Sequence, residues 1–349
     1  MSKISISQLI NYSCVRYSRL TDLINSEYAN SNANNINLYI DLYSILKPLY
    51  SSNLIIDDYT EITSCIINMC AHYRYFFRSR YNVETKIYLI WSSNIPYKNK
   101  NVYSEYNSKF EYTARTNTKI TSLINDNLEL LNILCPYIPD IMYVTDLYET
   151  GVIAQYISEM QDNYEIPGLF ITRDIYNFQL AKGDYSMKVL VPSKQTINNE
   201  FVDNSFIVNN LNACYLYANK LKVTIDEERL IQSELLSLLM ALSRVPSRNI
   251  ISLYNLPKAY KSILDLLDSK IIYYSHLYET DPVANYLHIY PDSLKARYFI
   301  CDIKSQLIHY QIDPAINIHQ SMINLYDPDE VKMINNKYFQ KYPLDLDRL

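Results

Sequence analysis

Glycine is scarce in this chain, with 3 residues out of 349, whereas tyrosine occurs 36 times. Glycine has GC-rich codons, and tyrosine, like the abundant asparagine and isoleucine, has AT-rich codons. The simplest cause is an AT-rich genome, and we hypothesise a virus, a phage or a similar parasitic element. The alternative is that the tyrosines stack on nucleic-acid bases, but their spread over the whole chain argues against it.

Closely spaced pairs of metal-binding residues are also lacking. The six cysteines include no Cys-x-x-Cys pair, and the five histidines include no His-x-x-x-His pair. Zinc sites are typically built from such pairs, and most of the cysteines have apolar sequence neighbours, so neither a zinc site nor a disulfide framework is expected. We predict buried thiols in a reducing compartment at all the cysteines: Cys14, Cys65, Cys70, Cys135, Cys214 and Cys301.

A basic excess and a long apolar run are missing as well. The net charge is −5, whereas a free-standing nucleic-acid-binding protein is usually basic, so any DNA contact must come from a local patch. No apolar run reaches the roughly 18 residues of a membrane span, and no signal-peptide pattern is present. We therefore expect a soluble intracellular protein, in the host cytoplasm if the gene is viral.

Strand-like and helix-like segments alternate in the first two thirds of the chain. Short apolar runs such as KIYLIWSS predict strands, and segments such as ITSLINDNLELLNIL predict helices. This alternation is typical of an α/β fold with a mostly parallel sheet between helices. We divide the chain into a helical extension (1–35), an α/β domain (36–225), a helical region (226–275) and a mostly helical tail (276–349).

Three polar residues fall at the ends of predicted strands, namely Asp41, Ser92 and Asp174. The carboxyl ends of parallel strands meet at one edge of a sheet, and ligands bind there. We therefore expect these residues to cluster at that edge.

The order of segments over residues 36–270 resembles the 5′-nuclease family, which includes flap endonucleases and the 5′ exonuclease domain of bacterial DNA polymerase I. YIDLYSILK carries the strand-end Asp41 and the helical Lys47, as in the family. KIYLIWSS has Ser92 where the family has aspartate, and EYNSKF shares only Tyr106 with the family's Tyr-Lys-x-x-Arg element. The resemblance implies the PIN-like 5′-nuclease fold.

Two later motifs strengthen this resemblance. YVTDLYETGVIA matches a family segment that reads Glu-Ala-Asp-Asp-Val-Ile-Ala; it keeps the apolar end and has Glu149 at the alanine position. TRDIYNFQL keeps Asp174 and Gln179 but has Tyr176 in place of the second aspartate.

The last matching segment, ALSRVPSRNIISLYNL, is similar to the start of the family's helix–hairpin–helix, which implies such a region within 226–275. Val245 and Arg248 occupy two acidic positions, and Ser252 and Asn255 occupy two glycine positions. Without glycine, the backbone cannot approach a DNA phosphate as closely.

The resemblance implies a damaged metal site. The family hydrolyses phosphodiesters with two Mg²⁺ ions, which need many carboxylate ligands. Of nine acidic positions, two remain acidic, Asp41 and Asp174. The other seven are Ser92, Tyr148, Thr150, Gly151, Tyr176, Val245 and Arg248.

The remaining acids have two interpretations. In the first, Asp41, Asp174 and Glu149 are vestigial catalytic residues. Of these, Asp41 and Asp174 would hold one weakly bound Mg²⁺ or none. Asp146 could substitute as a ligand. Equally, a strand-end aspartate caps the helix that follows it. Arg248 near this site would repel a cation.

Basic residues form a second set of candidates, for contact with nucleic acid. Arg74 and Arg78 share a helix face through their i,i+4 spacing, and a solvated helix face is the alternative for them as for most of the others. The candidates are Lys47, Arg74, Arg78, Arg80, Lys109, Arg115, Lys119, Arg248, Lys258 and Lys261.

Three functions remain open. The leading hypothesis is a catalytically degenerate nuclease that binds DNA, single-stranded or branched, or a protein subunit of a viral replication or transcription assembly. The second is an active, divergent Mg²⁺-dependent 5′-3′ exonuclease or flap endonuclease. The third is a structural scaffold subunit of a viral complex.

Overall fold

The computed structural model describes most of the chain. The described residues are 20–21, 35–50, 58–92, 118–146, 148–160, 166–181, 187–197, 200–225, 229–248, 250, 252–272, 274, 292–303, 305–306 and 325–349. Of the predicted extension 1–35, nearly all residues lie outside this part of the chain.

A six-stranded sheet forms the centre of the molecule, with the strand order β3-β2-β1-β4-β5-β8. All neighbours are parallel except β8, which runs antiparallel to β5. The strands are β1 (Asn35–Asp41), β2 (Glu84–Ser92), β3 (Ile141–Asp146), β4 (Gly168–Ile171), β5 (Lys188–Val191) and β8 (Phe206–Val208). The predicted α/β class with a mostly parallel sheet is confirmed.

The strand order reverses its direction of growth at β1. The chain adds β2 and β3 on one side of β1 and then returns to add β4 and β5 on the other side. A crevice forms at such a switch point, outside the carboxyl ends of the two strands that part there. Here these ends are Asp41 on β1 and Ile171 on β4.

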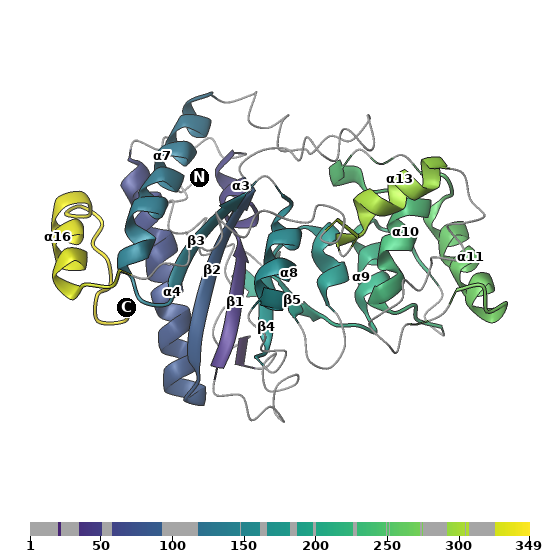
Figure 1. Cartoon of the computed structure of the whole chain (residues 1–349), viewed down its shortest axis with the longest axis horizontal. Helices are drawn as coiled ribbons and strands as arrows, with labels where there is room; N and C mark the ends of the chain where they lie inside the picture. The colour runs from purple at the N-terminus through teal and green to yellow at the C-terminus, as the bar shows by residue number, and fades with distance from the viewer. Residues whose placement is uncertain are drawn as a thin grey trace.

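Helices cover both faces of the sheet (Figure 1). One face carries α3 (Leu42–Tyr50), α4 (Tyr59–Tyr81) and α7 (Thr118–Leu134), which ends in the 3₁₀ turn η1 (Cys135–Tyr137). The other carries α8 (Thr150–Met160), the 3₁₀ helix η2 (Ile175–Leu180) and α9 (Ala213–Lys220). A helical region beyond α9 contains η3 (Ser233–Leu235), α10 (Leu236–Leu242), η4 (Pro246–Arg248), α11 (Leu256–Asp268) and α13 (Asp292–Cys301).

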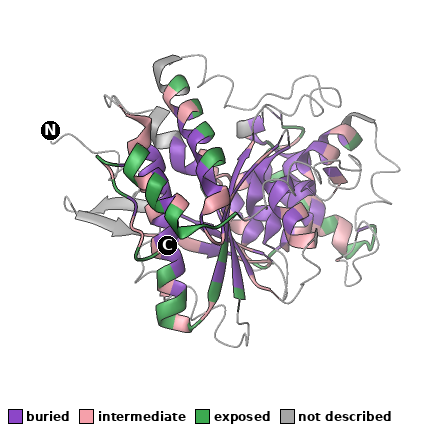
Figure 2. Ribbon diagram, turned by 60° about the vertical axis from the view of Figure 1, so that its left-hand side comes forward, coloured by how far each residue is buried: buried purple, intermediate pink, exposed green. Residues whose placement is uncertain are grey.

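The two faces of the sheet build two separate cores. Side chains alternate along a strand, so Leu38 and Ile40 pack towards α4 and α7, whereas Tyr39 between them packs towards α8. Both sides are apolar because helices cover both, as is usual for parallel sheets. Figure 2 shows the buried strands enclosed by helices whose exposed residues lie on their outer faces. A small antiparallel pair, β6 (Lys194–Ile197) and β7 (Glu200–Asp203), stands apart.

The segment predicted as a single tail, 276–349, contributes to both cores. Helix α13 packs against α10, with Leu294 and Ile303 in the core on the α8 side. Residues 325–349, including α16 (Pro328–Tyr338), lie against α4 and η1 instead. Figure 1 shows α13 in the helical region and α16 at the opposite end of the molecule.

Hydrogen bonds fasten residues 343–349 to α4. The Asn68 side chain donates to the carbonyl of Pro343 at 3.1 Å and accepts from the backbone of Asp345 at 2.7 Å. Arg74 donates to the carbonyl of Leu349 at 2.6 Å. Phe339 is fully buried in the core beneath this segment. Among the described helices, none is long and apolar enough to cross a bilayer.

Because Phe339 is fully buried in the α4–α7 core, the Phe339→Ala variant is expected to unfold about 3–5 kcal/mol more easily. Urea denaturation followed by circular dichroism measures this change. Met333→Ala is the matched control in α16, the helix that Phe339 directly follows, since Met333 is 55% exposed. Equal stability of the two variants would contradict the packing of α16 described here.

Candidate functional site

Asp41 and Asp174 meet at the switch point between β1 and β4, as the strand-end argument predicts. Thr172, just after β4, donates its hydroxyl to Asp41 Oδ2 at 2.8 Å, and its Oγ1 accepts the backbone N–H of Asp174 at 3.1 Å. Ser44, in the first turn of α3, also donates to Asp41 Oδ2, at 2.6 Å. Two hydroxyls therefore hold one carboxylate oxygen and connect the two aspartates.

Both aspartates also cap the helical segment that follows them. Asp174 Oδ1 accepts the backbone N–H of Tyr176 at 3.1 Å at the start of η2. Asp41 accepts a backbone hydrogen bond from Ser44 at the start of α3. Capping is thus an observed role of both residues.

Burial makes the Asp41 carboxyl an unfavourable anion. Its side chain is nearly inaccessible, and its Oδ1 has no hydrogen-bond partner among the described residues. Desolvation is the main cause that raises the Asp41 pKa to about 6, and the nearby charge of Asp174 adds to it; the hydrogen bonds from Ser44 and Thr172 act in the opposite direction.

Arg248 occupies the space next to Asp174. Its Nε donates to Glu149 Oε1 at 2.8 Å, and its Nη2 donates to Glu149 Oε2 at 2.8 Å. The same Nη2 lies 2.7 Å from Asp174 Oδ2. The arginine and glutamate side chains are only 7% and 9% exposed, so this is a buried, forked ion pair shared with a second carboxylate.

Local structure places the two partners of Arg248. Glu149 immediately precedes α8, and its carbonyl accepts the N–H of Ile153 at 3.1 Å, so it stands at the N-cap of that helix. Arg248 ends η4, inside a turn closed by two backbone hydrogen bonds between Val245 and Ile250. The ion pair therefore joins the edge of the sheet to the turn that follows α10.

Tyr176, a second substituted acidic position, packs on the same guanidinium. The Arg248 carbon Cζ lies 4.6 Å from the centre of the Tyr176 ring, a cation–π contact. The tyrosine hydroxyl donates to the carbonyl of Ile300 at 2.9 Å and accepts from the Gln306 amide at 2.7 Å. Residues 300–306 thus hold the ring in place against the ion pair.

Gly151 leaves no room for a side chain. A Cβ at this position would clash with Asn177 Oδ1 and would stand 2.7 Å from the Ile303 Cδ1 atom. A carboxylate at this position requires both neighbours to move. The remaining substituted positions Tyr148, Thr150 and Val245 are buried, and Ser92 is partly buried beside Asp146 in the β2–β3 pairing.

The Gln179 that this chain shares with the family motif has a structural task. Its amide donates to the carbonyls of Tyr176 and Cys301, each at 2.9 Å. Its oxygen accepts from Ser237 at 3.1 Å and from the backbone of Ile303 at 2.9 Å. Three of these four hydrogen bonds tie η2 to α10 and to residues 301–303, and the fourth lies within η2.

The residues present do not fit a divalent metal ion. Within the described part of the chain, no group of three or more aspartate, glutamate, histidine or cysteine side chains is placed to hold one. Glu149 and Asp174, which the sequence places near the site, are brought together by a guanidinium instead. Asp146, the alternative ligand, is buried at the end of β3.

The basic candidates that lie among the described residues do not form one surface. Arg74 is buried and donates to Asp140 at 2.9 Å. The prediction that Arg74 and Arg78 lie together on an exposed helix face is therefore wrong for Arg74. Arg78 is exposed and forms a forked pair with Glu84. Arg78 and the exposed Arg80 lie in the last turn of α4, next to the amino end of β2 and away from the strand ends that carry Asp41.

The other basic candidates are divided in the same way. Arg248 is buried in its ion pair, so in this arrangement it does not face a phosphate. Lys258 and Lys261 are exposed on the first half of α11, and Lys258 lies over the Tyr254 ring. Lys109 and Arg115, with Tyr106, lie outside the described residues, as do the side chains of Lys47 and Lys119.

Sequence reasoning missed three polar side chains of this site, which are the hydroxyls of Ser44 and Thr172 and the amide of Asn177. Ser44 lies three residues after Asp41, and Thr172 lies two residues before Asp174. Asn177 donates to Thr172 Oγ1 at 3.3 Å. The available signal for Ser44 was its place as the third residue of a helix that begins directly after Asp41, where the two side chains can form a hydrogen bond.

Comparison with known proteins supports the fold. No protein-family model and no curated protein sequence matches the chain. Two solved structures from bacteriophage T5 are similar, each with a TM-score of 0.50 over 88% of this chain. The T5 5′-exonuclease with bound zinc is 12% identical and is matched over 98% of its length. The T5 flap endonuclease variant, in a pseudo-enzyme–product complex with DNA and metal ions, is 13% identical and fully covered.

At this low identity the likeness concerns the fold. The chain has the PIN-like α/β fold of the flap-endonuclease type of 5′ nuclease, with a central sheet and a helical region on one side. The helices α10 and α11 lie where the sequence predicts the helix–hairpin–helix-like region.

Asp41→Asn is expected to stabilise the protein above pH 6 and to have little effect near pH 4. The folded pKa of about 6 lies above the unfolded value of 3.8, so the stability from the protonated carboxyl is full below pH 3.8 and lost as the pH rises to 6. The loss amounts to about 3 kcal/mol at most. Urea titrations at both pH values measure it.

The exposed carboxyl of Asp347 provides the control for this comparison. Asp347→Asn is expected to change stability equally and slightly at both pH values. A variant Asp41→Asn that is less stable than the parent protein at pH 7 would contradict the analysis of this site.

Proposed function

We propose that this chain is a catalytically degenerate 5′-nuclease-like protein whose fold serves as a binding module in a viral replication or transcription assembly. The single observation that carries the proposal is the Arg248 guanidinium, bound to both Glu149 and Asp174. The resemblance places metal-binding acids around this edge of the sheet. Here a permanent monovalent cation is built into the chain at that edge.

The electrostatics of the ion pair support this proposal. Arginine stays protonated at all ordinary pH values, and its fork matches a carboxylate with two parallel hydrogen bonds. A divalent ion at Glu149 or Asp174 would have to displace the guanidinium and leave it buried without a partner, which typically costs about 3–5 kcal/mol. Two-metal hydrolysis needs several carboxylates free to face the ions.

The burial of the carboxylates also supports the proposed loss of catalysis. As whole residues, Asp41 is 2% exposed and Asp146 and Glu149 are each 7% exposed. Tyr176, Gln306 and Ile303 pack over the region between η2 and α8. Within the described part of the chain, these side chains limit the approach of a phosphodiester to Asp41 and Glu149, while the Asp174 side chain is 18% exposed.

We propose a protein as the main partner, with DNA contact limited to exposed basic residues such as Lys258 and Lys261. The net charge of −5 favours a protein partner. The separation of Arg78 and Arg80 from the α11 lysines leaves no continuous basic stripe among the described residues. A viral setting is supported by the tyrosine-rich, glycine-poor composition, which an AT-rich genome would explain.

In a nuclease assay, the purified protein is expected to leave a labelled flap substrate intact, with Mg²⁺ or with Mn²⁺. The matched control is Asp41→Asn, which removes the buried carboxylate while keeping its size. Cleavage by the parent protein that Asp41→Asn abolishes would overturn the proposal in favour of an active, divergent 5′-3′ exonuclease or flap endonuclease. Size-exclusion chromatography with and without flap DNA then separates DNA binding from a purely structural role.

Replacing Arg248 is expected to make the melting temperature of the protein depend on divalent ions. Arg248→Ala leaves Glu149 and Asp174 buried without their partner and should lower stability by about 3–5 kcal/mol. Millimolar Mn²⁺ should then raise the melting temperature of this variant but not that of the parent protein, because a cation again neutralises the carboxylates.

The double variant Arg248→Ala with Glu149→Gln is the control, since it removes one of the two carboxylates. Its Mn²⁺ response should be much smaller. A parent protein whose melting temperature rises with Mn²⁺ as much as that of Arg248→Ala would show that the guanidinium does not exclude the metal.

A further inference from the structure

The exposed face of α11 carries a regular order of charges, which we call the α11 stripe. Its members, all exposed, are Lys258, Lys261, Asp265 and Asp268. A helix turns by about 100° per residue, so these four residues fall within an arc of about 80° around the axis. The buried residues on the opposite side of the helix are Leu256, Ala259, Tyr260 and Ile263. Figure 1 shows α11 at the outer end of the helical region, so the stripe faces away from the protein.

The α11 stripe is symmetric about Ile263, with the sign of the charge reversed. Lys261 and Asp265 lie two residues before and after Ile263. Lys258 and Asp268 lie five residues before and after it. A second α11 that packs antiparallel on the first therefore places each lysine opposite an aspartate. Two such helices are related by a two-fold axis, and the contact uses the same surface on both copies.

Within a single chain this order of charges is not favoured. The helix dipole favours acidic residues in the first turn and basic residues in the last turn, and α11 has neither. A lysine four residues before an acidic residue is also the weaker orientation of a helical pair. Among the described residues, no ion pair involves Lys258, Lys261 or Asp265. These three charges are therefore available to groups outside the chain.

The fourth charge of the stripe, that of Asp268, is shared with Arg229. The two terminal nitrogens of Arg229 donate to the two Asp268 oxygens at 2.9 and 2.7 Å, and the side chains are 52% and 58% exposed. A carboxylate this exposed can accept a second cation. Lys270 follows the helix, but three acidic residues, 226–228, directly precede Arg229 in the sequence. The surroundings of Asp268 therefore do not oppose the approach of a lysine.

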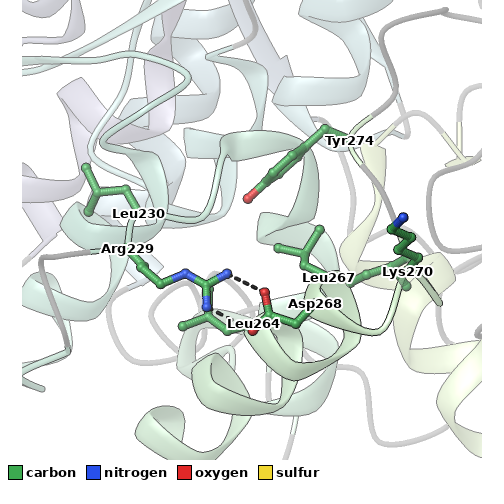
Figure 3. Close-up of a pocket in the computed structure, with 8 residues that line it drawn as sticks. Arg229, Leu230, Leu264, Leu267, Asp268, Lys270 and Tyr274 are labelled. Carbon is green, nitrogen blue, oxygen red and sulfur yellow. Dashed lines mark hydrogen bonds and ion pairs between the residues drawn. The ribbon is translucent and has the colours of Figure 1, made fainter.

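Apolar features at the two ends of α11 match each other in the same way. At one end the Leu253 residue is 47% exposed, while its backbone N–H donates to the carbonyl of Leu242 at 3.1 Å. At the other end is a pocket of about 640 Å³, whose lining includes Leu230, Leu264 and Leu267 (Figure 3). An antiparallel second copy brings its Leu253 to the end of α11 that carries this pocket. Burial of these apolar side chains then adds to the ion pairs.

The pocket end of this surface is held in position before a partner arrives. The buried Tyr260 of α11 donates its hydroxyl to the carbonyl of Arg229 at 2.7 Å. The hydroxyl oxygen of Tyr260 also accepts the N–H of Ile231 at 3.0 Å. A surface that is already fixed loses little further entropy on association.

We propose that the α11 stripe is a self-complementary surface on which two copies of this chain associate with their α11 helices antiparallel. Lys258 of each copy faces Asp268 of the other, and Lys261 faces Asp265. This inference goes beyond the proposed function, because association of two copies does not require the loss of catalysis. The dimer covers Lys258 and Lys261, so association and DNA contact at these lysines exclude each other.

Sedimentation velocity of the full-length protein measures the association, at a series of protein concentrations and at low and high salt. We expect a monomer–dimer equilibrium that shifts towards the dimer as the protein concentration rises. High salt should weaken the dimer, because salt screens ion pairs between exposed charges.

Two charge-reversal variants test the order of the charges. Lys258→Asp with Lys261→Asp makes the stripe wholly acidic, and Asp265→Lys with Asp268→Lys makes it wholly basic. The dimer of each variant should be at least about tenfold weaker than that of the parent protein, because like charges then face each other. A mixture of the two variants, one of them fluorescently labelled, should form a heterodimer about as stable as the parent dimer.

A matched control lies on α16, at the opposite end of the molecule (Figure 1). Lys332→Asp with Lys337→Asp reverses two exposed lysines there and should associate as the parent protein does. Leu253→Ser should weaken the dimer without reversing any charge, because it removes the exposed apolar side chain. Circular dichroism and urea unfolding check that each variant is folded.

Three results would overturn the proposal. One is a parent protein that stays monomeric at the highest concentration at which it is soluble. The second is a dimer that the reversed charges or Leu253→Ser leave unchanged, or a mixture that forms no heterodimer. The third is a monomer whose binding of labelled single-stranded DNA is lost in Lys258→Asp with Lys261→Asp, since the stripe would then be a nucleic-acid surface. The flap assay and the Mn²⁺ response test the loss of catalysis separately.

Discussion

The buried ion pair of Arg248 with Glu149 and Asp174 is the interaction on which the rest of the site depends. A guanidinium enclosed by protein is stable only when its donors are satisfied. Here two carboxylates accept its hydrogen bonds and the Tyr176 ring packs on its face. Arg248 and Tyr176, which the resemblance aligns with two acidic positions of the family, depend on each other here, because each side chain contacts the other.

The same principle applies to the substitutions around the pair. Gly151 lets Asn177 and Ile303 approach the start of α8, and the buried Val245 closes the turn that carries Arg248. Gln179, which the chain shares with the family motif, joins η2 to α10 and to residues 301–303. A site that must bind and release a charged substrate needs accessible polar groups, whereas Asp41, Glu149 and Arg248 are buried in the described structure.

Much of the architecture could be predicted from the sequence, because its signals are local. Runs such as KIYLIWSS have strand length and apolar, β-branched composition, and the ends of parallel strands must meet at one edge. The partners of the arginines could not be predicted in this way. Glu149 lies 99 residues from Arg248, and the Arg74 partner Asp140 lies 66 residues away, so helical spacing within α4 does not identify the carboxylate that pairs with Arg74.

The division of residues 276–349 between the two faces of the sheet has a consequence for synthesis of the protein on the ribosome. One core needs Leu294 and Ile303, and the other needs Ile334, Phe339 and Leu344. The sheet itself is made from much earlier residues, so a nascent chain carries all six strands before either apolar face can be fully covered. During that interval both faces expose hydrophobic side chains, and a chaperone or the assembly partner itself would have to shield them.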